Sequence, residues 1–447
     1  MKGKILILWK YLQTRYRPSF RSREQLCNWQ HHQVIRFLQA ILPHSAFYQQ
    51  LYQGSSLDNW HQFPIMDKKK MMDNFDRLNT VGILKQEAFE MALKAEETRD
   101  FTPTIRGVTI GLSSGTSGNR GIFLVSPEER LRWAGVMLAK VLPTSIFVKQ
   151  RVAFFLRANS NLYTSIEKGR IQFSFFDLLS PLEDHIESLQ QFQPTILVGP
   201  PSMLRFLAEA QKRNQLSIQP RKIISVAEVL DPLDQQIISQ VFQQIVHQVY
   251  QSTEGFLATT CSYGTLHMNE DLLVVQKEVM DEKLGKFIPI ITDFSRFTQP
   301  IIRYRLDDIL TEKKSPCPCG SPFLAIEQIE GRCDDLFYLP SLASSKLVSI
   351  FPDFIRRAII TTDDHIEEYL IIQHDPNHLE VSLKAAEGEQ DSIQKAVFTS
   401  LQKLFHQLGC QMPTILFTPY TLRPSDKKLR RVERRFSVKE EHDQRVK

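Results

Sequence analysis

Short apolar runs alternate with helical patterns from residue 108 onward, and this alternation limits the folds that the chain can adopt. Five runs have the length of strands, at 152–156, 171–176, 195–198, 223–226 and 246–250. Helical patterns occupy 202–212 and 231–242, the second with Asp231 as N-cap and Pro232 as the first helical residue. Such alternation predicts an α/β domain with a largely parallel sheet, whose ligands bind at the carboxyl ends of the strands.

The two ends of the chain differ from this central part. Residues 1–100 form an N-terminal segment whose patterns are helical, most clearly from 22 to 100. After about residue 335, the sequence predicts a strand pair at 369–373 and 379–384, a helix at 392–408 and a last strand at 414–417. We therefore expect a large N-terminal domain over 1–333, with parallel or mixed sheets and flanking helices. A small, mobile α+β domain over 334–447 would follow it.

Composition and apolar runs point to a cytoplasmic protein. No apolar run approaches the roughly 18 residues that a membrane span needs. The apolar run at 5–9 is too short for the core of a signal peptide, and no small-residue cleavage site follows it. Six cysteines in 447 residues do not indicate a disulfide scaffold.

Positive charge gathers at the C-terminus. Residues 421–447 hold ten Lys or Arg and five Asp or Glu, so this tail carries the whole net charge of +5. A cationic tail is typical of proteins that meet nucleic acid or a membrane surface, and it can also deliver a cation to a phosphate inside the protein. The ordinary alternative is a solvated helix face.

Residues 113–121 read Ser-Ser-Gly-Thr-Ser-Gly-Asn-Arg-Gly and directly follow the apolar run 108–112. Glycine lets a backbone approach a ligand closely, and hydroxyls with backbone N–H groups can surround phosphate oxygens. The loop is not a Walker A loop, because Asn119 and Arg120 follow Gly118 where that motif has lysine and a hydroxyl residue. Taken alone, it indicates either a phosphate-binding loop or a polar surface loop.

Three further segments follow this loop in a characteristic order: Tyr-Gln-Ser-Thr-Glu at 250–254, Tyr-Arg-Leu-Asp-Asp at 304–308 and Gly-Arg-Cys-Asp-Asp at 331–335. With them, the sequence resembles the adenylate-forming enzymes, specifically the phenylacetate–CoA ligase branch. The resemblance covers nearly the whole chain, including 42–48 and 63–68. It implies an enzyme that uses ATP to convert a carboxylic acid into an acyl-adenylate and pyrophosphate. A thiol, usually that of CoA, then displaces AMP, and the small C-terminal domain rotates between the two half-reactions.

The resemblance also implies roles for individual residues. The nucleotide-binding residues would be Ser113, Ser114, Gly115, Thr116, Ser117, Gly118, Ala227, Glu228, Tyr250 and Asp308. Among these, the loop would hold the β- and γ-phosphates, Ala227 and Glu228 the adenine side, and Asp308 the ribose hydroxyls. Thr253 would contact the α-phosphate, Glu254 would hold Mg²⁺, and Arg332 would reach the phosphate or ribose. Asp334 matches the hinge.

The C-terminal tail contains the last implied catalytic residue. Residues 425–432 resemble the family's Ser-x-Gly-Lys-x-x-Arg segment, which aligns Lys428 with the lysine that bridges the attacking carboxylate and the α-phosphate. Lys427 stands where the family has glycine, so Lys427 is an alternative for this role. The stretch after Asp335 also departs from the family, because it lacks the glycine-containing turn. The sequence therefore supports the transfer to a thiol, of CoA or of a carrier protein, less firmly than it supports the adenylation step.

Four residues form a candidate zinc site. Cys317 and Cys319 lie in a Cys-Pro-Cys-Gly run, and upstream Cys261 is followed six residues later by His267. Three thiolates and one imidazole match a closed tetrahedral zinc site of structural type. The phenylacetate–CoA ligase branch carries similar segments. The alternative is a set of buried thiols beside a turn.

Two other functions remain open. The deazaflavin-coenzyme adenylating enzymes of the same branch esterify AMP to a hydroxyl and need no thiol. A non-catalytic protein that binds nucleotide or nucleic acid is disfavoured, because it would not need Lys428, Asp308 and Glu254 together. The favoured substrate is an aryl acid, for which Phe173, Phe175 and Phe176 could form an aromatic wall, although core packing is the commoner fate of such residues. A homodimer remains open.

Overall fold

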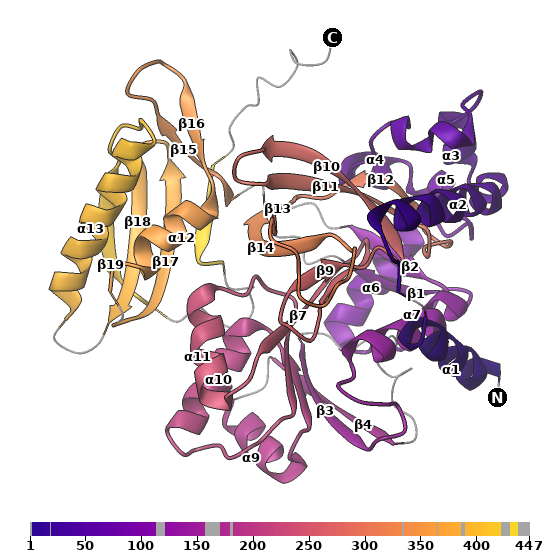
Figure 1. Cartoon of the computed structure of the whole chain (residues 1–447), viewed down its shortest axis with the longest axis horizontal. Coiled ribbons are helices and arrows are strands. Elements are labelled where there is room, and N and C mark those ends of the chain that lie inside the picture. Colours follow the sequence, from indigo (N-terminus) through magenta and orange to yellow (C-terminus); the bar gives the residue numbers. More distant parts are fainter. Residues whose placement is uncertain are drawn as a thin grey trace. The chain divides into compact units, whose positions relative to one another are not determined.

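The computed structural model describes residues 2–17, 19–112, 121–156, 170–178, 182–332, 335–363, 365–385, 389–421 and 430–436 (Figure 1). The chain forms two compact units. The first comprises Met1–Leu306 and Leu310–Ile329, and the second comprises Asp307–Ile309 and Glu330–Lys447. The expected domain boundary between 333 and 334 falls on residues outside the described part of the chain and stays a prediction.

Five parallel strands form one half of the main sheet in the first unit. In order across the sheet they are β4 (Ile171–Asp177), β3 (Gln150–Leu156), β5 (Ile196–Gly199), β6 (Lys222–Ser225) and β7 (Val246–Ser252). Each overlaps one of the predicted apolar runs, with ends that differ by no more than two residues. The α/β fold class predicted from the sequence is therefore confirmed.

Helices cover both faces of these strands. Helices α9 (Leu182–Phe192), α10 (Pro201–Lys212) and α11 (Pro232–Phe242) pack on the face that carries Phe155 and Leu197. Helices α1 (Lys2–Arg15) and α7 (Pro127–Val141) pack on the face that carries Phe154 and Val198, because successive residues of a strand point to opposite sides. Asp231 caps α11 as predicted, since its side chain accepts a hydrogen bond of 3.0 Å from the Leu233 N–H.

The sheet continues as antiparallel strands beyond β7. These are, in order, β8 (Gly255–Thr260), β9 (Leu266–Met268), β14 (Ala325–Arg332), β13 (Asp308–Glu312), β11 (Lys286–Asp293) and β10 (Leu273–Asp281), with β12 (Ile301–Arg305) paired to β11. The N-terminal helices that follow α1 are α2 (Arg23–Ile41), η1 (Leu42–His44), α3 (Ala46–Leu51), η2 (Leu57–Gln62), α4 (Lys68–Asp73), α5 (Phe75–Leu78) and α6 (Lys85–Thr98). Most of them pack with the antiparallel strands into one apolar core.

Strands β1 (Thr109–Leu112) and β2 (Ile122–Val125) form a separate antiparallel hairpin. The Ser/Gly loop follows the carboxyl end of β1, but β1 lies outside the parallel sheet. The apolar runs before and after the loop pair with each other, with Leu112 opposite Ile122, so the loop joins the two strands of a hairpin. The loop residues 113–120 themselves lie outside the described residues.

The second unit is built on a four-stranded sheet. Its order is β19 (Thr414–Pro419), β18 (His378–Ala385), β17 (Ile366–Asp375) and β20 (Val432–Arg434). Helices α12 (Pro352–Ile360) and α13 (Gln390–Gln407) pack together, and the stretch after Asp335 forms the hairpin β15 (Phe337–Pro340) and β16 (Leu347–Ile350). The predicted strand pair, helix and last strand of a small α+β unit are all present. No helix among the described residues is long and apolar enough to cross a bilayer.

Candidate active site and metal site

Two of the predicted segments lie at the same edge of the sheet. Strands β6 and β7 are parallel neighbours with Ser225 opposite Gln248, so the chain that leaves β6 toward Ala227 starts at the edge of the sheet where β7 continues to Tyr250. The backbone of Ala227 has a positive φ of 69°, and the Glu228 carboxylate accepts a hydrogen bond from the Ser202 N–H at 3.4 Å. The predicted adenine-side residues and Tyr250 therefore follow neighbouring strands at one edge of the sheet, and their contact with a nucleotide stays a prediction.

Thr253 and Glu254 form the tight turn between β7 and β8. Ser252 pairs with Gly255 across the turn, and the Glu254 N–H donates to the Ser252 hydroxyl at 3.2 Å. Because β8 begins at Gly255, Glu254 lies in a turn between two strands and not beside a helix N-cap. Among the described residues, the Thr253 hydroxyl and the Glu254 carboxylate have no hydrogen-bond or ion-pair partner. A hydroxyl and a carboxylate presented in this way suit a phosphate oxygen and a hard cation such as Mg²⁺.

Arg296 ties this turn to the base of the Ser/Gly loop. Its guanidinium donates to the Thr253 carbonyl oxygen at 3.2 Å and to the Leu124 carbonyl oxygen at 3.1 Å. Leu124 lies in β2, the strand that begins where the Ser/Gly loop ends. One side chain therefore holds together the two segments that the sequence predicts to bind phosphate.

The carboxylate of Asp293 lies close to Gly255, the residue that follows this turn. Asp293 is fully buried, and its carboxylate accepts hydrogen bonds from the Ser295 N–H at 2.8 Å and the Ser295 hydroxyl at 2.6 Å. Burial raises the pKa of Asp293 to about 6. A Cβ on Gly255 would lie 2.5 Å from the Asp293 carboxylate, so only glycine lets the turn approach so closely.

The residues that follow Asp293 are fixed by two more buried side chains. The Glu129 carboxylate of α7 accepts hydrogen bonds from the Phe297 N–H at 2.6 Å and the Thr298 N–H at 2.8 Å. The Gln299 amide bonds to both the N–H of Leu124, at 2.8 Å, and the carbonyl of Ile122, at 3.1 Å. The sequence analysis missed this 293–299 segment. Its signal was a polar run, Asp-Phe-Ser-Arg-Phe-Thr-Gln, set between two apolar strands.

We expect an Arg296→Met variant to lose about tenfold in the rate of the chemical step, which corresponds to about 1.4 kcal/mol. The substitution keeps the apolar stem but leaves two carbonyl oxygens without their donor, so the turn loses its fixed position. The measurement is the kcat and the ATP KM of the activity proposed below. Arg296→Lys is the matched control, because one ammonium can still reach one carbonyl and should restore part of kcat. Equal loss of folded protein in both variants, with unchanged kcat per folded molecule, would contradict a positioning role.

The other predicted site residues lie in the second unit or outside the described part of the chain. Asp308 is half-buried, opens β13 and belongs to the second unit, and Arg332 is the last residue of β14. The Arg332 side chain lies outside the described residues, as do Asp334, Lys427 and Lys428. The same holds for the loop residues Ser113, Ser114, Gly115, Thr116, Ser117 and Gly118, with Asn119 and Arg120. Their roles stay predictions.

Part of the basic tail is held inside the second unit. Arg430 pairs with Asp335, and the buried Arg431 pairs with Glu368 at 2.6 Å. Arg434 donates to the Leu336 carbonyl at 2.8 Å. Each of these cations has a partner within the protein, which weakens the alternative of a basic surface for nucleic acid.

The proposed aromatic wall on β4 is wrong as a set of three. Phe173 and Phe175 pack on the side of α1 and α7, whereas Phe176 lies on the opposite face and stacks on Phe155 with ring centroids 4.7 Å apart. The reason is the alternation of side chains along a strand. Phe176 is part of the core beneath α9 and α10.

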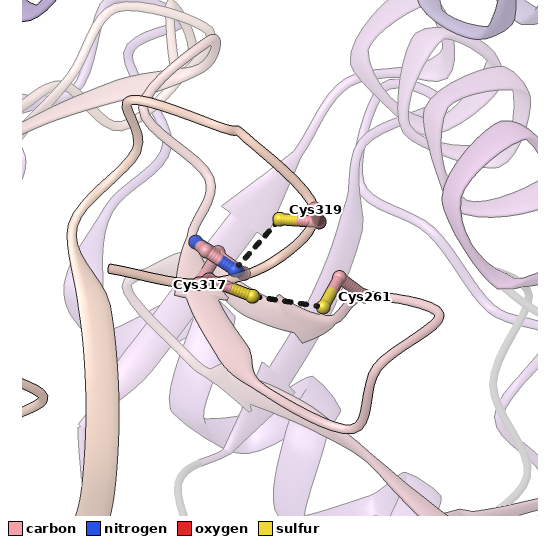
Figure 2. Close-up of side chains that lie close together, drawn as sticks. Cys261, Cys317 and Cys319 are labelled. Carbon is pink, nitrogen blue, oxygen red and sulfur yellow. Dashed lines mark hydrogen bonds between the residues drawn. The ribbon is translucent and has the colours of Figure 1, made fainter. Parts of the chain in front are cut away.

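The four candidate metal ligands converge in the first unit (Figure 2). Their ligand atoms all lie within 4.8 Å of one another. The sulfurs of Cys261 and Cys317 are 3.7 Å apart, and the Cys319 sulfur lies 3.4 Å from Nε2 of His267. A tetrahedral zinc ion with Zn–S of about 2.3 Å and Zn–N of about 2.0 Å sets these separations at about 3.8 and 3.5 Å. A disulfide needs about 2.05 Å, so the geometry suits a metal and excludes a bond between these sulfurs.

The surroundings of the four ligands also suit a metal. His267 lies in β9 between β8 and β14, and its Nδ1 is 3.2 Å from the Phe323 carbonyl oxygen, which leaves Nε2 as the ligand atom. Burial opposes ionisation of Cys317, but hydrogen bonds from Thr265 and from the Cys319 backbone lower its pKa to about 6. Burial raises the pKa of Cys319 to about 11. The lowered pKa of Cys317 favours its thiolate, the form that binds metal.

Comparison with known proteins identifies the fold. No family model matches the sequence, and no curated protein matches it. Among solved structures, 2-hydroxyisobutyryl-CoA ligase in complex with 2-HIB-AMP is 15% identical with a TM-score of 0.68, over 93% of this chain and 91% of that one. The anthranilate-CoA ligase AuaEII in complex with anthranoyl-AMP is 12% identical with a TM-score of 0.51, over 72% and 66%. The amide bond synthetase McbA from Marinactinospora thermotolerans is 12% identical with a TM-score of 0.50, over 74% and 69%.

The chain thus has the fold of the adenylate-forming enzymes, as its sequence motifs predicted. The assignment to the phenylacetate–CoA ligase branch stays a prediction.

Proposed function

We propose that this protein is an ATP-dependent ligase that converts a carboxylic acid into an acyl-adenylate with release of pyrophosphate. One observation carries the proposal: Arg296 fastens the Thr253–Glu254 turn to the strand that begins at the end of the Ser/Gly loop. These are the two segments that such an enzyme needs around one triphosphate. The shared fold and the acyl-adenylates bound by two of the similar ligases support it.

In the first half-reaction, a carboxylate oxygen attacks the α-phosphorus of ATP, and the bond from that phosphorus to the bridging oxygen of pyrophosphate breaks. Two anions must meet, so the site has to neutralise charge and fix their positions. The Thr253 hydroxyl would donate to an α-phosphate oxygen, and the Ser/Gly loop would enclose the β- and γ-phosphates. Glu254 would hold Mg²⁺, which supplies positive charge against the phosphates. Lys428 would place its ammonium between the carboxylate and the α-phosphate.

In the second half-reaction, we propose that a thiol sulfur attacks the acyl carbon and AMP leaves. Two of the similar proteins are named as CoA ligases, so CoA is the favoured acceptor. A carrier-protein thiol would allow the same reaction. Asp334 would be the hinge about which the second unit rotates between the two steps. The acid is proposed to be an aryl acid. The reaction consumes ATP, and we propose that it takes place in the cytoplasm.

We further propose that Cys261, His267, Cys317 and Cys319 bind a structural zinc ion. Four protein ligands leave no open position for a substrate, so the ion would serve as a cross-link. It would join the turn after β8 to the loop between β13 and β14. The support is the fit of the sulfur and nitrogen separations to tetrahedral geometry.

Acid-dependent exchange between ATP and labelled pyrophosphate tests the adenylation step. We expect exchange with at least one member of a panel of aryl and aliphatic acids, and loss of that exchange in a Glu254→Gln control. Adding CoA should then yield a thioester and free AMP. A product that retains AMP, formed without a thiol, would favour the adenylyl-transfer alternative. No exchange with any acid would contradict the proposal.

A further inference from the structure

Helix α1 is apolar on two sides, and the rest of the described chain covers only one of them. On the inner side, Tyr11 is fully buried and its hydroxyl accepts a hydrogen bond from the Ile146 N–H at 3.1 Å. A Cβ on Gly135 of α7 would lie 2.7 Å from the Ile7 carbonyl oxygen, so the two helices touch backbone to backbone. Figure 1 shows α1 lying along α7. The helix is therefore a fixed part of the first unit and presents its outer side in one orientation.

The outer side is an exposed apolar stripe. Its members lie at spacings of four, three and four residues, which place them on one face of a helix. They are Ile5, Trp9 and Leu12 of α1 and Tyr16 directly after it, exposed by 61%, 52%, 41% and 66%, with Leu8 beside them at 38%. A helix that is apolar all round is normally buried on every side, and large apolar patches on a protein surface mark sites of interaction. The stripe therefore needs a partner.

The charge around the stripe identifies the kind of partner. Residues 2–23 hold seven Lys or Arg and no Asp or Glu. Arg23 is paired with Glu270, and Arg17 lies over the Trp29 ring at 4.0 Å. The Arg15 guanidinium donates to the carbonyl oxygens of Ala139 and Leu142 at 2.9 and 3.3 Å, whereas Lys4 on α1 is exposed. A second copy of the chain that used the same face would bring these cations against their own equivalents, because a two-fold contact pairs a surface with itself. An anionic partner with an apolar interior would suit both the stripe and its charge.

We propose that the outer face of α1 docks on the surface of an anionic lipid membrane. Trp and Tyr are the side chains that favour the level of the lipid headgroups. Apolar side chains of an interfacial helix enter the boundary of the acyl chains, while Lys and Arg attract anionic headgroups. The stripe and the cations of α1 provide both interactions. This inference does not depend on the proposed enzymatic activity.

Co-sedimentation with lipid vesicles tests the inference on the full chain. We expect binding to vesicles of phosphatidylcholine mixed with phosphatidylglycerol, and at least about tenfold weaker binding to phosphatidylcholine alone. The double variant Trp9→Ser/Leu12→Ser should bind the mixed vesicles at least about tenfold more weakly, because two large side chains no longer enter the lipid. Lys4→Glu should weaken binding less, and added salt should weaken the binding of the wild type.

Val279→Ser is the matched control, because Val279 in β10 is also 61% exposed and lies outside α1. It should bind vesicles like the wild type. Thermal melts of all variants check that each is folded. Failure of the folded wild type to bind mixed vesicles would overturn the proposal. So would a wild-type dimer that the Trp9→Ser/Leu12→Ser change dissociates, because the face would then be an interface between two copies.

Discussion

A Cys319→Ser variant is expected to lose bound zinc and to melt about 6 °C or more below the wild-type protein. Loss of a metal site is among the few changes that cost about 4 kcal/mol or more. At an unfolding entropy of about 2.1 cal/mol/K per residue, a change of 1 kcal/mol shifts the melting temperature of the first unit by about 1.5 °C. The cost is high here because Cys261 and Cys317, whose sulfurs are 3.7 Å apart, are separated by 56 residues. Without the ion, only weak contacts would hold the turn after β8 to the 317–320 loop.

Zinc content per chain and the thermal melt are the two measurements for this prediction. Cys27→Ser is the matched control, because Cys27 is an exposed free cysteine remote in sequence from the four ligands. It should retain one zinc ion per chain and the wild-type melting temperature. Removing zinc from the wild type with a chelator should lower its melting temperature to that of the Cys319→Ser variant. Purified wild-type protein that contains no zinc, and whose stability does not respond to added zinc, would contradict the assignment.

The parts of the fold that could be predicted depend on residues close together in the chain. Strands β3 to β7 were predictable because each is a short apolar run, and the helices between them carry local caps such as Asp231. The carboxyl ends of parallel neighbours meet at one edge, so the position of Ala227 and Tyr250 after neighbouring strands at this edge follows from the same pattern.

The parts that could not be predicted depend on distant partners. Arg296 donates to carbonyl groups 43 and 172 residues away, and no local pattern specifies either contact. The β1–β2 hairpin was missed because only the apolar run before the Ser/Gly loop was taken into account. The exposed side of α1 could not be predicted from the sequence either, because a run of consecutive apolar residues does not indicate which side of a helix the rest of the protein covers.

The zinc ligands could be named from the sequence, but their convergence could not be predicted from it. Their residue types gave the candidate set, but a Cys-x-Cys spacing does not by itself bring two sulfurs to one ion. The turn at Gly320, with φ of 71°, and the pairing of β9 between β8 and β14 bring Cys319 and His267 together. The convergence of all four ligand atoms within 4.8 Å thus depends on strand pairing and on a turn, which the spacing of the residues does not specify.

Replacing Lys428 by alanine is expected to lower the rate of acid-dependent ATP–pyrophosphate exchange by about 10²–10³-fold. The ammonium would face the carboxylate and the α-phosphate while charge shifts between them, so it acts mainly in the transition state. ATP binding should therefore be nearly unchanged. The segment that carries Lys428 is anchored just after it, because Arg430 pairs with Asp335 and Arg431 pairs with Glu368. The substitution should leave those two ion pairs, and hence the fold of the second unit, intact.

Lys427→Ala is the matched control, since it removes a neighbouring cation from the same segment. If Lys428 is the catalytic residue, Lys427→Ala should exchange pyrophosphate at nearly the wild-type rate, and the reverse result would assign the role to Lys427. The transfer of a chemically prepared acyl-adenylate to CoA separates catalysis from misfolding. It needs no charge between carboxylate and α-phosphate, so Lys428→Ala should carry it out at close to the wild-type rate. If both lysine variants exchange pyrophosphate normally, the cation that meets the α-phosphate comes from another part of the chain, and Arg120 becomes the next residue to replace.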